Sequence, residues 1–239
     1  INSILSFKKN LSLYDITPAF LQQYEDHLVK DKKSNSTIGI YMRQLRAIIN
    51  QAISDKILSA DLYPFKKYEI PSGQNIKKAL PNDDLQKLLS CIPANSDQAK
   101  ALDFWVLSYL CNGMNMTDII HLKPVNINGD YMHFIREKTK RTKKKDLRPI
   151  RVGLNPKAKQ IIARQRTTEN NNPFLFPILE KDLTPVTTKH RCQRFVKWVN
   201  KHMEAIRKDL KIDQKVGTYA ARHSFSTVLK RKGAPTSFI

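Results

Sequence analysis

The chain has 239 residues, enough to bury a sizeable core in one large or two modest domains. Its 42 Lys and Arg against 21 Asp and Glu give a net charge of +21, which indicates an anionic partner, with nucleic acid ahead of a membrane surface. There is no apolar run of about 20 residues, no N-terminal signal pattern and no disulfide or metal spacing among the three cysteines, Cys91, Cys111 and Cys192. These absences argue against a membrane-spanning or secreted protein and favour a reducing, cytoplasmic setting.

Amphipathic helices are predicted in the N-terminal part. The run PAFLQQYEDHLVK, residues 18–30, places its apolar side chains on one helical face. Residues 38–58 do the same, with an expected core stripe of Ile38, Tyr41, Leu45, Ile48, Ile49, Ala52 and Ile53. Arg43 and Arg46 lie off this stripe. They are either ordinary solvated residues or the phosphate-contacting edge of a DNA-binding helix.

A segment rich in Pro, Gly and Lys, PFKKYEIPSGQNIKKALP, then interrupts the helical pattern. We therefore predict a bundle of about four helices over residues 1–66, a linker over 67–80 and a second domain over 81–239. The second domain carries +16 of the net charge.

The second domain begins with helices and then changes period. ALDFWVLSYLCNG predicts a buried helix that stops at Asn112-Gly113, after which MTDIIHL resumes. YMHFIREKTKRTKKKDLRPIRVGL predicts two strands around a basic turn. PKAKQIIARQR and HRCQRFVKWVNKHMEAIRKDL are helical again, and the second places Phe195, Val196, Trp198, Val199 and Met203 toward a core. The fold class is mainly α, with a small antiparallel sheet.

The basic turn supplies the first candidate for chemistry. Residues 136–151 hold nine Lys or Arg and two acids, and most of these lysines are expected to be ordinary solvated residues. Lys138 differs because it lies where the strand gives way to the turn. There its ammonium can be aimed at a phosphate or a leaving oxygen.

The second candidate is GTYAARHS, residues 217–224. In a helix, Tyr219 and Arg222 share one face, and the small residues around them permit close approach by a backbone. Arg222 could clamp two phosphate oxygens through its planar fork. The alternative is a buried Arg222 paired with a carboxylate, beside a packed His223.

Taken in order, these features resemble the tyrosine recombinases, the phage integrase family. The resemblance is carried by STIGIYMRQLRAIINQA, LCNGMNMTDIIHL, FIREKTK and TYAARHSFST, spans almost the whole chain, and is nearest to integrases of Bacteroides mobile elements. It implies a SAM-like core-binding domain followed by a catalytic domain, closed as a C-shaped clamp around double-stranded DNA. Such enzymes cut and rejoin attachment sites through a 3′-phosphotyrosyl intermediate, as tetramers on DNA, without a metal or cofactor.

The resemblance also assigns roles to residues. Lys138 corresponds to the hairpin lysine, Arg222 to the second arginine and Tyr219 to the histidine position. Asn115 stands at the position of the first arginine, and the cation that replaces that arginine stays open. The expected DNA contacts are Lys33, Ser36, Thr37, Arg43, Arg46, Lys140, Arg141, Lys189 and Arg191.

The nucleophilic tyrosine is expected beyond Ile239, so residues 1–239 should bind DNA without cleaving it. Two other interpretations remain. One is a non-catalytic DNA-binding protein on a degenerate recombinase fold, which Asn115 and Tyr219 would suit. The other is an RNA-binding protein, which is disfavoured because the aromatic residues lie within apolar stripes rather than on a stacking platform. For a recombinase, the location would be the bacterial cytoplasm, next to the nucleoid.

Overall fold

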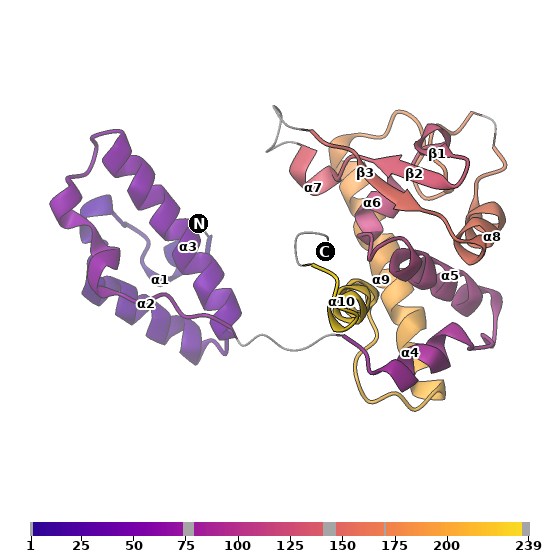
Figure 1. Cartoon of the computed structure of the whole chain (residues 1–239). Coiled ribbons are helices and arrows are strands. Elements are labelled where there is room, and N and C mark those ends of the chain that lie inside the picture. Colours follow the sequence, from indigo (N-terminus) through magenta and orange to yellow (C-terminus); the bar gives the residue numbers. More distant parts are fainter. Residues whose placement is uncertain (1, 74–78, 141–146, 170, 236–239) are drawn as a thin grey trace. The chain divides into compact units, whose positions relative to one another are not determined.

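The computed structural model describes residues 2–73, 79–140, 147–169 and 171–235 (Figure 1). It divides the chain into two compact units, Ile1–Ile76 and Lys77–Ile239. The mainly helical fold with a small antiparallel sheet is confirmed. No helix in the described ranges has the length and apolar character needed to cross a membrane.

The described part of the first unit contains three α-helices. Side-chain caps fix the residues at which the two long helices begin. The Thr17 side chain accepts a hydrogen bond from the N–H of Phe20, and the Ser34 side chain accepts one from Thr37. These helices are α1 (Asn2–Phe7), α2 (Pro18–Lys30) and α3 (Asn35–Ser54), with short 3-10 turns η1 (Leu13–Asp15), η2 (Ala60–Leu62) and η3 (Pro64–Lys67).

The core of this unit corrects one prediction. Ile48 is 47% exposed, whereas Ile49 is completely buried. Adjacent residues on a helix lie about 100° apart, so only one of the two can face the core. Met42, which was not predicted, completes the buried stripe.

The chain after α3 is more closely bound to the first unit than expected. Two 3-10 turns, η2 and η3, follow α3, and the second begins at Pro64, which has no N–H to donate to a longer helix. The Tyr68 hydroxyl donates a hydrogen bond to Glu25, and Ile70 contacts the same core. Part of the predicted linker therefore belongs to the first unit.

The second unit is built around α5 (Ser96–Leu110), which buries Phe104 and Trp105 completely. Helices α8, α9 and α10 pack against α5, and the sheet lies at one end of the unit (Figure 1). The other elements are α4 (Asn82–Leu89), α6 (Met116–Ile120), η4 (Pro124–Asn126), β1 (Ile127–Asn128), β2 (Tyr131–Phe134), α7 (Glu137–Lys140), β3 (Ile150–Gly153), α8 (Pro156–Gln165), α9 (Pro185–Asp209) and α10 (Thr218–Arg231).

The sheet has the strand order β1-β2-β3, and every pairing is antiparallel. Met132 pairs with Val152, and both are buried, as the alternating pattern requires. The strand β2 ends at Phe134, earlier than expected, so Lys138 lies in the one-turn helix α7 instead of at the end of the strand.

Helix α9 also differs from the sequence-based expectation at its start. It begins at Pro185, five residues before the predicted His190, because the Thr184 side chain caps the N–H of Thr187. Of its predicted core residues, Val199 and Met203 are buried, while Phe195, Val196 and Trp198 are half-buried against the same core.

Candidate active site

The site begins at the turn between α5 and α6, which the sequence makes unusually tight. Asn112 and Gly113 both have left-handed backbone, with φ of 57° and 63°. A Cβ at Gly113 would lie 3.0 Å from the Cα of Arg222, so only glycine lets α10 approach this closely. The close approach places Arg222 Nη1 2.9 Å from the Gly113 carbonyl oxygen, to which it donates.

The start of α10 is held by side chains from two other helices. Asn200 in α9 accepts a hydrogen bond from the N–H of Thr218 at 2.8 Å. The indole N–H of Trp105 in α5 donates to the Gly217 carbonyl oxygen at 3.0 Å. These contacts fix the position of α10 and hence that of Arg222.

The surroundings of Arg222 differ from those of an ordinary buried ion pair. Its side chain is half-buried, and its guanidinium donates a hydrogen bond to a carbonyl oxygen. A carbonyl group has no net charge, so this contact does not neutralise the arginine. His223 is exposed rather than packed, and its ring centroid lies 5.8 Å from that of Tyr219. Tyr219, at the predicted histidine position, is 58% exposed.

Asn115, at the predicted first-arginine position, caps a helix. It is the N-cap of α6, and its Oδ1 accepts a hydrogen bond from the N–H of Thr117 at 2.9 Å. The side chain thus stabilises the helix start and brings no positive charge to the site.

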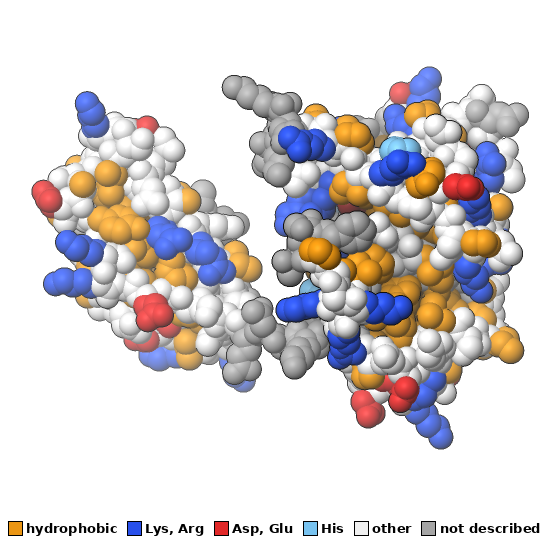
Figure 2. Space-filling model, viewed as in Figure 1, with side chains coloured by type: hydrophobic (Ala, Val, Ile, Leu, Met, Phe, Trp, Pro, Cys, Tyr) orange, Lys and Arg blue, Asp and Glu red, His pale blue; other side chains and the backbone are white. Residues whose placement is uncertain are grey.

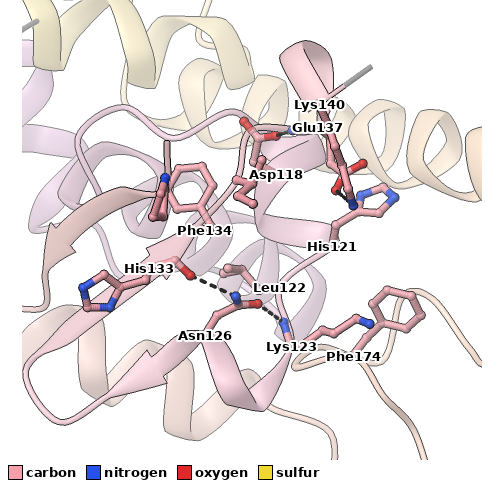
Figure 3. A pocket seen from close by; sticks show the side chains of 12 residues that line it. Asp118, His121, Leu122, Lys123, Asn126, His133, Phe134, Glu137, Lys140 and Phe174 are labelled. Atoms are coloured by element: carbon pink, nitrogen blue, oxygen red, sulfur yellow. Dashed lines mark hydrogen bonds and ion pairs between the residues drawn. The ribbon is translucent and has the colours of Figure 1, made fainter. Parts of the chain in front are cut away.

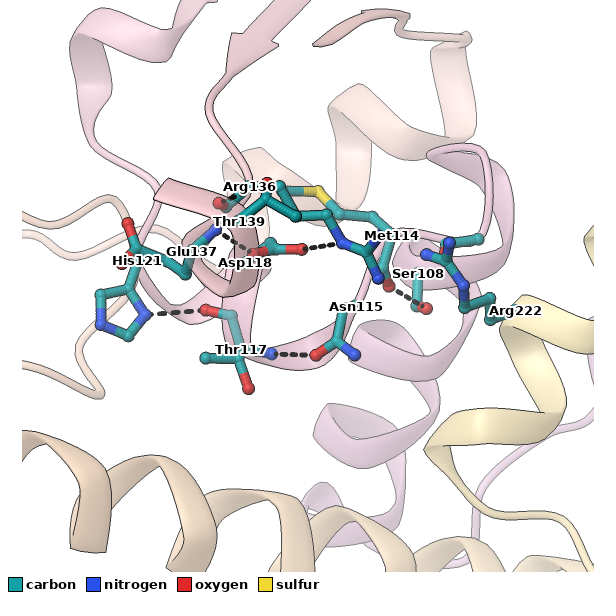
Figure 4. A network of polar contacts seen from close by, with 11 residues as sticks. Ser108, Met114, Asn115, Thr117, Asp118, His121, Arg136, Glu137, Thr139 and Arg222 are labelled. Carbon is teal, nitrogen blue, oxygen red and sulfur yellow. Dashed lines mark hydrogen bonds and ion pairs between the residues drawn. The ribbon is translucent and has the colours of Figure 1, made fainter. Parts of the chain in front are cut away.

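The positive charge nearest in role to the missing arginine belongs to a residue of another segment. Arg136, between β2 and α7, lines the same cleft as Asn115, and its guanidinium is drawn on the side of Asp118 that faces Arg222 (Figure 4). Its Nε lies 3.9 Å from Oδ2 of Asp118 and is buried, without a hydrogen-bond partner among the described residues. The side chain as a whole is 32% exposed, so part of the guanidinium can reach a ligand.

Asp118 links these groups. It is 6% exposed, and its Oδ1 accepts a hydrogen bond from the N–H of Glu137 at 2.9 Å. Burial raises the pKa of Asp118, while the N–H of Glu137 and the charges of Arg136 and Arg222 act in the opposite direction. The carboxylate therefore orients Arg136 and the start of α7, and it lies within electrostatic reach of both arginines.

Lys138 completes the group as an exposed residue of α7. With Arg136 and Asn115 it lines a cleft of about 1070 Å³, whose other wall is formed by α9. We call this the basic cleft. Its lining also includes Thr117, Asp118, His121, Glu137, Leu183, Pro185, Thr188, Lys189, Cys192, Gln193, Val196 and Lys197.

Sequence reasoning missed both Arg136 and Asp118. Arg136 precedes Lys138 by only two residues, within the FIREKTK segment, and Asp118 follows Asn115 by three. That proximity was the available signal. It did not distinguish Arg136 from the eight other cations of residues 136–151.

The predicted DNA contacts of the second unit are placed unevenly. Lys189 lines the basic cleft, whereas Arg191 forms an ion pair with Glu180 on another face of α9. Lys140 lies 3.2 Å from Glu137 Oε1. Arg141 lies outside the described residues.

The predicted DNA contacts of the first unit gather at the start and along the outside of α3. Lys33, Ser36, Arg43 and Arg46 are exposed, and Thr37 is half-buried. Among the residues with described positions, Arg43 and Arg46 form no ion pair with a carboxylate. Lys and Arg side chains are also seen on the visible face of each unit (Figure 2).

A second cavity, of about 490 Å³, lies on the sheet side of Asp118. His121, Phe134 and Phe174 line it, and His133 points away from His121 (Figure 3). In the described part of the chain no three His, Cys, Asp or Glu side chains are grouped so that they could hold a metal ion.

The helical first unit is followed by a helical unit with a three-stranded antiparallel sheet, and Arg136 and Lys138 line one cleft of this second unit. Residues 1–70 match the family model of the phage integrase SAM-like domain. The chain is 28% identical over 213 residues to the tyrosine recombinase XerD of Listeria innocua serovar 6a, an alignment that covers 86% of this chain and 66% of that protein. The chain spans just under two thirds of this relative's length.

Solved structures show the same fold. The Tn1549 transposon integrase in complex with transposon right end DNA superposes with a TM-score of 0.72 at 14% identity, covering 98% of this chain and 80% of that one. A lambda integrase dimer bound to a COC′ core site superposes with a TM-score of 0.66 at 12% identity, covering 98% and 78%.

Proposed function

We propose that this chain is the DNA-binding and phosphate-activating part of a site-specific tyrosine recombinase that integrates or excises a mobile element. The single observation that carries the proposal is the position of three cations relative to the α5–α6 turn: Arg136 and Lys138 line one cleft with Asn115, and Arg222 donates to the Gly113 carbonyl oxygen, in a chain that is similar to a tyrosine recombinase. Three cations from two distant segments would meet one phosphodiester there.

Arg136 replaces the missing first arginine in this proposal. It lines the same cleft as Asn115, the position that the resemblance gives to that arginine. The buried Asp118 carboxylate holds one edge of Arg136, and about a third of the side chain stays exposed. A side chain held by packing on one edge and open on the other is suited to bind an anion without reorganising.

The chemistry then follows from charge. A tyrosine oxygen attacks the scissile phosphorus, forms the 3′-phosphotyrosyl bond and displaces the 5′ oxygen. Arg136 and Arg222 would neutralise the charge that builds up on the non-bridging oxygens. Lys138 would give a proton to the departing 5′ oxygen. The attacking tyrosine would be supplied by the full-length gene product.

The first unit would add affinity and position. Arg43 and Arg46 on α3, with Lys33 and the hydroxyls of Ser36 and Thr37, would contact phosphates of double-stranded DNA at an attachment site. Binding should weaken steeply with salt. In the complete protein the active assembly would be a tetramer on DNA, located in the bacterial cytoplasm at the nucleoid.

The test is to incubate the full-length gene product with its element's attachment-site DNA and to look for a protein–DNA adduct that survives SDS. The adduct should form, map to a tyrosine and disappear in the Arg222→Ala variant. Tight, salt-sensitive binding without any adduct would refute the recombinase.

That negative result would favour a second function, a non-catalytic DNA-binding protein on the recombinase fold. The observation in its favour is Asn115, which serves as a helix cap where the family resemblance places a catalytic arginine. The same assay separates the two functions, because only the recombinase forms the covalent bond.

A further inference from the structure

Helix α9 lines two different clefts with two different faces. One face lines the basic cleft with Thr188, Lys189 and Gln193, whereas Arg194 and Trp198 line a different cleft. At 3.6 residues per turn, these two sets lie about half a turn apart around the helix axis. Whatever occupies the second cleft is therefore separate from a phosphodiester bound at Arg136 and Lys138.

The second cleft, which we call the aromatic cleft, has a volume of about 400 Å³. The rings of Phe195 and Trp198 stack there with centroids 5.6 Å apart. Phe195 also packs edge-to-face on the fully buried Phe104 at 4.9 Å, which fixes the cleft floor to the core. Pro177 and Ile178 complete the apolar wall. This volume suits one or two inserted side chains.

Cations surround this apolar floor. Lys100 Nζ lies 6.0 Å from the centroid of the Trp198 ring, and Arg194 is exposed at the edge of the cleft. Arg191 also lines the cleft but is paired with Glu180. Within the described ranges neither Lys100 nor Arg194 forms an ion pair with a carboxylate. Two cations beside exposed aromatic surface fit a ligand that is apolar at its centre and acidic around it.

We propose that the aromatic cleft docks an acidic segment of a partner protein that carries one aromatic or large aliphatic residue. The apolar residue would lie on Trp198 and Phe195, and flanking carboxylates would pair with Lys100 and Arg194. The proposal does not depend on DNA cleavage, because the cleft is on the face of α9 opposite the basic cleft. An accessory protein could bind there while DNA occupies the site.

The test uses intrinsic fluorescence, because the chain has two tryptophans and Trp105 is fully buried with its indole N–H hydrogen-bonded. Trp198 therefore reports binding. The probe is an acetylated 12-residue peptide of Glu and Gly with one central Phe, titrated near physiological salt. We expect saturable quenching that weakens about tenfold when the peptide's Phe is replaced by Ser, since part of a Phe side chain loses its burial.

Matched variants of the protein separate this site from general attraction to a basic surface. Arg194→Glu should weaken peptide binding about fivefold or more, because an attraction becomes a repulsion. Lys157→Glu makes the same charge change at an exposed position on α8 and should have little effect. Both positions are exposed, so the core should fold as before, which urea unfolding can verify.

Three outcomes would overturn the proposal. Equal weakening by Arg194→Glu and Lys157→Glu would mean non-specific electrostatic binding. Equal affinity for the Phe and Ser peptides would mean that the rings do not hold an anchor. The cleft would be a nucleic-acid site if a single-stranded oligonucleotide quenched Trp198 with higher affinity than the peptide did, and if Arg194→Glu abolished this quenching. None of these results bears on adduct formation, so the recombinase proposal is tested separately.

Discussion

Replacing Arg136 by Ala should abolish most of the cleavage activity of the full-length gene product while leaving DNA binding largely intact. Arg136 is held beside the buried Asp118, with about a third of its side chain exposed toward the basic cleft. If it binds a non-bridging oxygen, its loss removes one charged donor from the transition state. Single donors of this kind are worth roughly 10²–10³ in rate, or about 3–4 kcal/mol.

The predicted effect on binding is much smaller. One lost phosphate contact should reduce the slope of log affinity against log salt by about 1. Folding should suffer moderately. Asp118 is buried and loses its neighbouring cation, although it keeps its hydrogen bond from the N–H of Glu137, so the cost should be about 1–3 kcal/mol.

The assay is single-turnover formation of the SDS-resistant adduct, with binding measured on the same DNA at several salt concentrations. Arg166→Ala removes one exposed positive charge after α8 and is the matched control, expected to cleave normally. Arg136→Lys should recover only part of the rate, because an ammonium cannot reproduce the planar fork. If Arg136→Ala cleaved at the wild-type rate, Arg136 would not be the replacement for the first arginine.

Three further predictions concern the same site. Lys138→Ala should lower the rate of cleavage by about 10²–10⁴ with little change in DNA binding. DNA with sulfur as the 5′ leaving atom should restore the rate, because this leaving group needs no proton. If the sulfur-substituted DNA did not restore the rate, Lys138 would not be the general acid. Gly113→Ala should lower the free energy of unfolding by about 1–3 kcal/mol in urea titrations, because φ is 63° and a Cβ would meet Arg222 at 3.0 Å. The raised pKa of Asp118 means that its contribution to stability is complete below the ordinary value of 3.8 and is lost as pH rises through the raised value. The wild type should therefore lose stability relative to Asp118→Asn above about pH 4, and parallel unfolding curves at all pH values would contradict this.

Much of the fold could be predicted from the sequence, because hydrophobic period and capping act over a few residues. The helix at 18–30 has the predicted bounds, and the strand alternation around Met132 is as expected. The prediction that Ile48 is buried together with Ile49 was wrong, because the predicted stripe is wider than the surface that the core can cover. The predicted start of α9 was wrong because Thr184 and Pro185 are residue types typical of loops, and here they form the N-cap and the first residue of the helix.

The site was less predictable, for a physical reason. Arg136 stands in a run of nine cations of the same chemistry, and nothing local ranks one above another. What distinguishes Arg136 is a buried carboxylate 18 positions earlier in the chain, which accepts a hydrogen bond from the N–H of Glu137, the residue after Arg136. The close approach of Gly113 to α10 is another contact that only the fold creates.

The position of the positive charge can itself be tested, because Asn115 and Arg136 converge on one place from two segments. In the Arg136→Ala background, Asn115→Arg should return part of the lost cleavage, since it puts a guanidinium where the family resemblance expects one. The substitution removes the cap on Thr117 and should cost about 1 kcal/mol of stability. Recovery should therefore be measured well below the unfolding temperature, with Asn115→Arg alone as the control. If the double variant stayed as inactive as Arg136→Ala, the two side chains would not serve the same phosphate oxygen, and Arg136 would have to act through Asp118 and α7 rather than on the DNA.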